Sequence, residues 1–150
     1  MIIRLFRRLL AEAILFKENR FHPLVWIVGN PIIGEGVYIG GMSEVNGKDA
    51  VVTIGAFCDI GSFVAINCAD SHRRCIGLSD KIDRRDITIE PRVFIGSHCF
   101  VKGGAYIGHH SVVASGTIVD DSMKIPPYSL VMGNPMIVIP GHFETKMRKQ

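Results

Sequence analysis

The sequence has no long uninterrupted apolar run, no stripe of basic residues and no closely spaced pair of cysteines. Charged residues break the apolar N-terminal segment, which excludes a transmembrane helix of about 20 apolar residues and argues against a signal peptide. The net charge of +3 over 150 residues is spread along the chain, so we expect no nucleic-acid partner. The four cysteines form no Cys-x-x-Cys pair, which favours reduced thiols in a cytoplasmic protein.

Long helices are also disfavoured, because the 16 glycines are costly inside a helix. The exception is the segment 1–20, whose apolar residues fall on one helical face, largely opposite Arg4, Arg7, Arg8 and Glu12. That face is made of Ile2, Phe6, Leu9, Leu10, Ala13 and Ile14. We expect a short amphipathic helix that packs on the rest of the domain or on a neighbouring subunit. The alternative is a basic helix that lies on the inner face of a membrane.

A six-residue period dominates the chain from about position 31. An aliphatic residue returns at positions 33, 39 and 45, at 54, 60 and 66, and at every sixth position from 89 to 119. The next residue is mostly Gly or Asn, which tolerate left-handed backbone angles. Position five of the unit is small or β-branched, except at Asp70. Six residues suit a short strand and a sharp turn, so three units predict one triangular coil of an all-β solenoid with parallel strands.

Two gaps interrupt this period. The first, between positions 45 and 54, is three residues longer than a unit and predicts an outward bulge. The second runs for twenty-three residues from Ile66 to Ile89, so a polar segment at about 70–86 must leave the coil as an excursion loop. Long loops on a rigid scaffold commonly carry function. Asp70 and His72, where the period stops, are therefore the first candidates for a functional site.

The repeat resembles that of the hexapeptide-repeat acyltransferases over residues 27–140. Three motifs are similar to the sugar O-acetyltransferase branch of that family: "INCADSH", "FIGSH" and "GNP". The resemblance implies a left-handed parallel β-helix and a homotrimer. It also implies acetyl transfer from acetyl-CoA to a hydroxyl of a sugar or glycan precursor in polysaccharide biosynthesis, with no metal. Residues 1–20 and the basic tail 141–150 flank this domain.

The resemblance gives His72 the role of general base. The chemistry fits, because a histidine can take a proton near neutral pH from a hydroxyl or amine that attacks a thioester. The backbone amide of Ser97 would stabilise the oxyanion, unless Ser97 is an ordinary corner residue. Asn67 and Asp70 would bind the acceptor. Asn67 is alternatively a corner residue, and Asp70 either orients His72 or caps the loop.

The same resemblance places coenzyme A in a groove between two subunits. The matching positions are Phe94, Ser97, Ser115, Gly116, Thr117 and Pro135. Two departures affect the phosphate contacts. The run "DDSMK" is two residues longer than in relatives, and no basic residue follows "GNP" closely. The phosphates would then contact Lys124 or the tail residues Lys146, Arg148 and Lys149.

Other functions remain open at this point. N-acetylation of an amino sugar or a nucleotide-linked amino sugar needs the same base. A metal-dependent enzyme similar to the gamma-type carbonic anhydrases would use histidines such as His72, His98, His109 and His110, although their spacing differs from that family's pattern. A non-catalytic structural solenoid is the third alternative, and the polar excursion argues against it.

Overall fold

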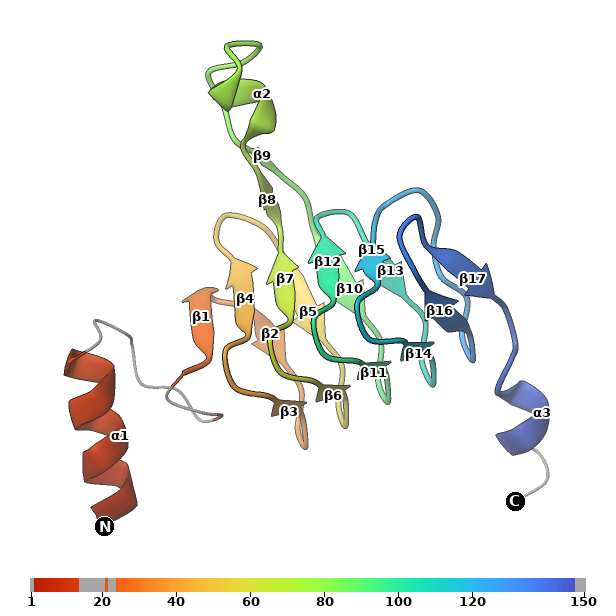
Figure 1. Ribbon diagram of the computed structural model, residues 1–150, viewed down its shortest axis with the longest axis horizontal. Coiled ribbons are helices and arrows are strands. Elements are labelled where there is room, and N and C mark those ends of the chain that lie inside the picture. The colour runs from red at the N-terminus through yellow and green to blue at the C-terminus, as the bar shows by residue number, and fades with distance from the viewer. Residues whose placement is uncertain (1, 14–20, 22–23, 148–150) are drawn as a thin grey trace.

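The computed structural model describes residues 2–13, 21 and 24–147, and most of these form a parallel β-helix (Figure 1). The predicted solenoid is thereby confirmed. Its coils are triangular and wind left-handedly. Strands that are one coil apart in the sequence stack beside each other. All neighbouring strands of the coils pair in parallel except the last pair, which is antiparallel.

Three sheets form the sides of the triangle. The first sheet contains β1 (Trp26–Gly29), β4 (Glu44–Gly47), β7 (Ala65–Asn67), β12 (Phe100–Lys102) and β15 (Ile118–Val119). The second contains β2 (Ile32–Ile33), β5 (Val52–Ile54), β10 (Ile87–Ile89) and β13 (Tyr106–Ile107). The third contains β3 (Tyr38–Ile39), β6 (Asp59–Ile60), β11 (Phe94–Ile95), β14 (Val112–Val113), β16 (Leu130–Met132) and β17 (Ile137–Ile139).

The aliphatic positions of the repeat form the core, as the period predicts. Ile60, Ile95 and Val113 stack in register along the third sheet, and none of them is accessible to solvent. The small position-five residues also point inward. Where such a residue is polar it is hydrogen-bonded: Ser43 Oγ donates to the carbonyl of Gly61 at 3.0 Å. Stacked apolar ladders on all three sides therefore fix the register of the coils.

Glycine follows the aliphatic residue for a different reason from the predicted one. The left-handed angles occur two residues later in the unit, as at Phe63 (φ 58°) and His98 (φ 60°). The glycine itself lies against the next coil. A Cβ on Gly55 would sit 2.4 Å from the backbone nitrogen of Pro91, and one on Gly96 would meet the next coil at 2.5 Å. Close backbone approach, and not a left-handed angle, excludes side chains there.

Three helices complete the described chain. They are α1 (Ile2–Ala13), α2 (His72–Cys75) and α3 (Glu144–Met147). Helix α1 confirms an amphipathic helix within the segment 1–20, and the rest of that segment lies outside the described residues. None of the described helices is long and apolar enough to cross a membrane. Of the four cysteines, all free, three are buried and Cys75 is exposed.

Candidate active site

The predicted excursion is a narrow arm that leaves the edge between the first and second sheets. Strands β8 (Ala69–Asp70) and β9 (Asp83–Arg84) pair antiparallel along it, and helix α2 lies beyond them (Figure 1). We call residues 69–84 the arm, and the edge that it leaves the arm corner. The amide of Arg85 donates to the carbonyl of Cys68 at 3.0 Å and closes the root of the arm. The arm therefore projects away from the coils on a paired, hydrogen-bonded base.

His72 and Asp70 form a dyad on this arm. The His72 ring atom Nδ1 lies 2.6 Å from Asp70 Oδ1, and the His72 backbone amide donates to the same oxygen at 3.0 Å. An ionised carboxylate only accepts hydrogen bonds, so Nδ1 carries a proton, and in the neutral imidazole Nε2 then holds the lone pair. The imidazole is 64% exposed, which leaves Nε2 accessible to a substrate. Asp70 thus orients His72 and caps the turn at once.

The environment of Asp70 keeps it in the form that this dyad needs. The hydrogen bonds from the His72 amide and ring lower the pKa of Asp70 below its ordinary value. Both bonds are made to the charged form, so the carboxyl group is ionised throughout the neutral range. The carboxylate therefore remains an acceptor for the proton on Nδ1 of His72 at neutral pH.

A hollow lies beside the dyad, at the root of the arm. Its walls are Asp70, His72, Asp83, Arg84, Arg85 and Lys102. The Lys102 side chain points outward from the first sheet into this wall and is 36% exposed. Acidic and basic side chains and the exposed edge of the imidazole border the hollow. A polar acceptor substrate could therefore be held there by hydrogen bonds.

Ion pairs fix the root of the arm to the last coil. Arg85 Nη1 donates to Asp121 Oδ2, and Lys102 Nζ lies 3.6 Å from the other oxygen of the same carboxylate. The hydrogen bond from Arg85 is the main cause of a lowered pKa at Asp121. Gly104 leaves room for this contact, since a Cβ there would approach Asp121 Cβ to 2.9 Å. Asp121, in the run "DDSMK", thus supplies a carboxylate that braces the arm.

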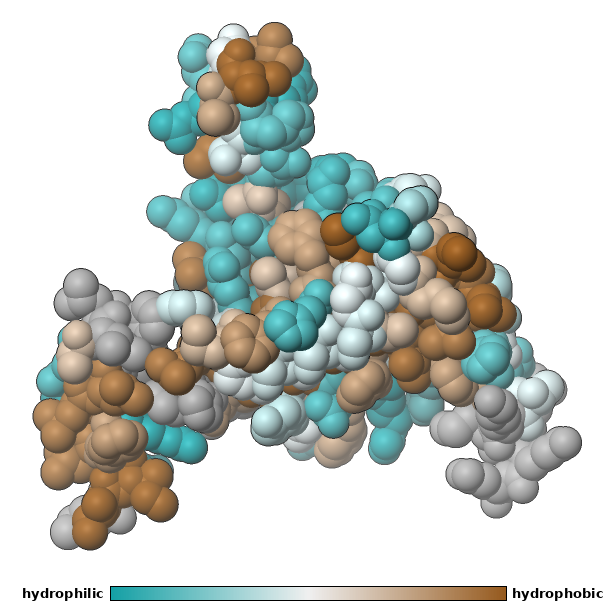
Figure 2. Space-filling model, in the orientation of Figure 1, coloured by the Kyte–Doolittle hydropathy of each residue, from teal (hydrophilic) through white to brown (hydrophobic). Residues whose placement is uncertain are grey.

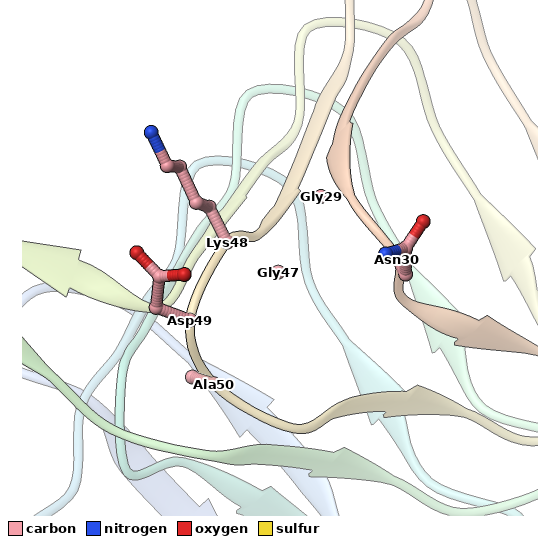
Figure 3. A pocket seen from close by; sticks show the side chains of 6 residues that line it. All are labelled: Gly29, Asn30, Gly47, Lys48, Asp49 and Ala50. Carbon is pink, nitrogen blue, oxygen red and sulfur yellow. The ribbon is translucent and has the colours of Figure 1, made fainter.

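Arg84 ties the other side of the arm to the bulge after β4. Its Nη1 donates to the carbonyl of Lys48 at 2.7 Å, and its Nε lies 3.7 Å from Asp49 Oδ2. The bulge has the three extra residues that the nine-residue gap predicts, and it borders a second hollow. Figure 3 shows Lys48 and Asn30 on opposite sides of that hollow, with no side chain between them at Gly29 and Gly47. The arm is therefore anchored on both of its flanks.

The predicted cofactor positions lie at a different edge of the triangle. We call the edge between the third and first sheets the serine corner. Ser97 and Ser115 lie there on successive coils, and the Ser97 carbonyl accepts from the amide of Gly116, which follows Ser115, at 2.9 Å. No described residue accepts a hydrogen bond from the Ser97 amide, as the proposed oxyanion contact requires. The amide of Ser115 is equally free among the described residues, so this feature does not single out Ser97.

The remaining predicted residues divide between these two edges. Pro135 follows β16 and is exposed near the serine corner, and Phe94 points outward from the third sheet with 43% exposure. Lys124 lies in the connection after β15, at the arm corner, with Nζ 5.3 Å from the centre of the Tyr106 ring. Asn67 ends β7, and its Oδ1 accepts from the Ala69 amide at 2.9 Å. Asn67 therefore caps the start of the arm.

Thr117 is placed differently from a cofactor contact. Its side chain is buried, and its Oγ1 donates to the carbonyl of Ala114 at 2.6 Å and accepts from the Gly133 amide at 3.1 Å. Both hydrogen-bonding capacities of the hydroxyl are used inside the coil. Thr117 can thus shape the serine corner, but its hydroxyl does not face solvent.

The catalytic and cofactor candidates do not meet within one chain. The first sheet separates the arm corner from the serine corner, and the arm projects away from the coils at its own edge (Figure 1). A site that needs both sets of residues must therefore bring the arm of one copy to the serine corner of another.

The histidines considered for a metal are scattered. His98 stacks on Phe63 at the serine corner, with ring centres 4.9 Å apart. His109 and His110 contact each other and Tyr128 at the edge between the second and third sheets. In the described part of the chain, no three His, Cys, Asp or Glu side chains come together as metal ligands.

Sequence reasoning missed Arg84, Arg85 and Asp121 as supports of the site. Their partners are 35 or 36 residues away in the sequence, and the charges alone do not show which residues pair. The acidic run "DDSMK" was the available signal, because it lies in the connection that the period places at the same edge as the arm.

Comparison with known proteins supports the fold. No protein-family model matches the chain. It is 27% identical over 113 residues to a 2,3,4,5-tetrahydropyridine-2,6-dicarboxylate N-succinyltransferase of Xylella fastidiosa, covering 67% of this chain and 36% of that protein. The chain thus spans only about a third of that relative.

Two solved structures are similar in both sequence and shape. The polySia-specific acetyltransferase NeuO is 27% identical with a TM-score of 0.63, over 77% of this chain and 60% of that one. A galactoside acetyltransferase in complex with coenzyme A is 26% identical with a TM-score of 0.59, over 82% and 65%. These similarities, together with the repeat, place the chain among proteins that share its coil architecture.

Proposed function

We propose that the chain is a hexapeptide-repeat acyltransferase that transfers an acyl group, most simply acetyl, from acyl-CoA to a sugar hydroxyl. The observation that carries the proposal is the dyad on the arm, in which Asp70 occupies Nδ1 of His72 and leaves Nε2 free. The similar acetyltransferases, one of them bound to coenzyme A, support the donor and the sugar class of acceptor. Acceptor contacts would come from Asp70 and Asn67 beside the hollow at the root of the arm.

The proposed reaction needs one group that carries the proton and one hydrogen-bond donor that stabilises the oxyanion. His72 Nε2 takes the proton from the acceptor hydroxyl as its oxygen attacks the thioester carbonyl. The carbonyl oxygen becomes an oxyanion, which the Ser97 amide of a neighbouring copy stabilises. The tetrahedral intermediate collapses, the C–S bond breaks, and the imidazolium returns its proton to the departing thiolate. The products are an acyl ester and free coenzyme A.

N-acylation of an amino sugar is the second candidate, and the similarity to an N-succinyltransferase is the observation that favours it. A thiol-release assay with acetyl-CoA and succinyl-CoA, run against sugars, amino sugars and nucleotide sugars, separates the two. We expect thiol release with a hydroxyl acceptor. Release only with amino acceptors would replace the first candidate by the second. No turnover together with no binding of either acyl-CoA in calorimetry would overturn both.

The brace at the root of the arm leads to a prediction about Asp121. Replacing Asp121 with alanine removes the shared carboxylate partner of Arg85 and Lys102, so His72 should be held less accurately. We expect kcat to fall about tenfold, because small misplacements of a catalytic group are costly, while the KM for acyl-CoA stays unchanged. Steady-state kinetics measure both constants.

The control for this prediction is the neighbouring Asp120→Ala. Asp120 accepts from the Ser122 amide at 2.9 Å and makes no described ion pair with the arm. Its replacement should leave kcat near the original value, and Asp121→Glu should restore part of the loss. An equal fall of kcat in both alanine variants would contradict this prediction. It would show that any substitution at this corner lowers activity, whether or not it removes the ion pairs of Asp121.

A further inference from the structure

Helix α1 presents an apolar face that no described residue covers. Ile2, Phe6 and Leu9 are 81%, 62% and 54% exposed. Figure 2 shows apolar atoms gathered over α1, at the lower left of the view. An exposed contiguous apolar surface of this kind marks an interaction site. We therefore expect this face to bind a partner.

The charges of α1 indicate what that occupant is. At 100° per residue, the apolar side chains fill one continuous half of the helix, and Arg4, Arg7, Arg8 and Glu12 lie in the other half. Arg8 pairs with Glu12 at 3.2 Å, while Arg4 and Arg7 have no carboxylate partner among the described residues. An apolar half beside an arginine-rich half is the pattern of helices that lie at a lipid surface.

The length of α1 fits the same occupant. Twelve residues give a helix about 18 Å long, shorter than the roughly 30 Å apolar core of a bilayer, but long enough to lie flat in its interface. A second copy of α1 would bring further arginines to the contact. Anionic headgroups would instead neutralise them. Phe6 and Leu9 can enter the acyl boundary while the arginines stay at headgroup level.

From these observations we propose that α1 binds the chain to the surface of an anionic membrane. The apolar half supplies burial, and the arginines supply attraction to negatively charged headgroups. The contact is peripheral and does not depend on the proposed acyl transfer.

Sedimentation of the full chain with lipid vesicles tests this proposal. One set is pure phosphatidylcholine, and the other is phosphatidylcholine and phosphatidylglycerol in equal parts. We expect at least about tenfold stronger binding to the anionic set, because each basic residue near such a surface contributes. The double variant Arg4→Glu/Arg7→Glu should lose that preference. Phe6→Glu should weaken binding about tenfold or more to the anionic vesicles.

The matched control is Ile76→Glu, which places the same acid at a site on the arm exposed to a similar extent, 66% against 62% for Phe6. Its vesicle binding should equal that of the unchanged chain. An equal loss in Phe6→Glu and Ile76→Glu, or no binding of the unchanged chain to anionic vesicles, would overturn the proposal. A lower mass of Phe6→Glu than of the unchanged chain, in light scattering without lipid, would also overturn the proposal. It would show that the apolar face of α1 contacts a second copy of the chain.

Discussion

Replacing His72 with alanine is expected to lower kcat/KM for acyl transfer about a thousandfold, because a positioned general base contributes on this order. The ring is 64% exposed on a projecting arm, so its loss opens no cavity in the core. The thermal midpoint and the affinity for acyl-CoA should therefore remain unchanged. Thiol release, calorimetric binding and thermal unfolding of the same preparation measure the three quantities.

Two further variants show whether the loss comes from proton transfer. Arg73→Ala changes the next residue of α2, which is exposed and makes no described ion pair, and should retain activity. Asp70→Asn can present an amide N–H to Nδ1 and so favour the tautomer that has its proton on Nε2. We expect it to lose about tenfold or more without a change in folding. If His72→Ala kept its activity, His72 would not be the base.

Replacing Gly55 with alanine is expected to destabilise the coils by about 3 kcal/mol, the upper range for overpacking a well-filled site. The added Cβ would lie 2.4 Å from the backbone nitrogen of Pro91 and 2.7 Å from the carbonyl carbon of Glu90. Both atoms belong to the backbone of the next coil, which cannot move without disturbing the stacked ladders. In a chain of this size the thermal midpoint should fall by about 6–12 °C.

Gly47→Ala is the matched control for this effect. Its Cβ would meet Pro31 at 3.4 Å, an ordinary contact, and its φ lies outside the left-handed region. The thermal midpoint should stay within a degree or two of the original, since a compatible glycine-to-alanine change is close to neutral or slightly stabilising. Equal losses at Gly55 and Gly47 would contradict the packing explanation of these glycines.

The sequence predicts the coils well because each unit repeats the same six-residue pattern. An aliphatic residue fills the core, a small residue follows at the corner, and no alternative register buries both sets. The departure of the chain near Asp70 is predictable for the same reason, since a gap of twenty-three residues cannot remain in phase. The reason for the glycines was less accessible. Steric crowding between coils depends on the stacking distance, which no single unit contains.

The site was only partly predictable. The period marks His72 and Asp70, and two residues of separation are enough to suggest their contact. The brace from Arg85 to Asp121 joins segments that meet only after two coils have stacked, so charge patterns do not reveal it. The division of the candidates between the arm corner and the serine corner also emerges only in three dimensions. Because of that division, we expect a complete site to form only between two copies of the chain.

A mixed-assembly experiment tests this claim most directly. His72→Ala lacks the proposed base but keeps its serine corner, whereas Ser115→Trp blocks its serine corner but keeps the base. Each variant alone should be nearly inactive. In closed rings assembled at random from equal amounts, about one interface in four combines an intact arm with an intact corner. We therefore predict recovery of about a quarter of the original activity, and no recovery in verified mixed assemblies would contradict a site shared between copies.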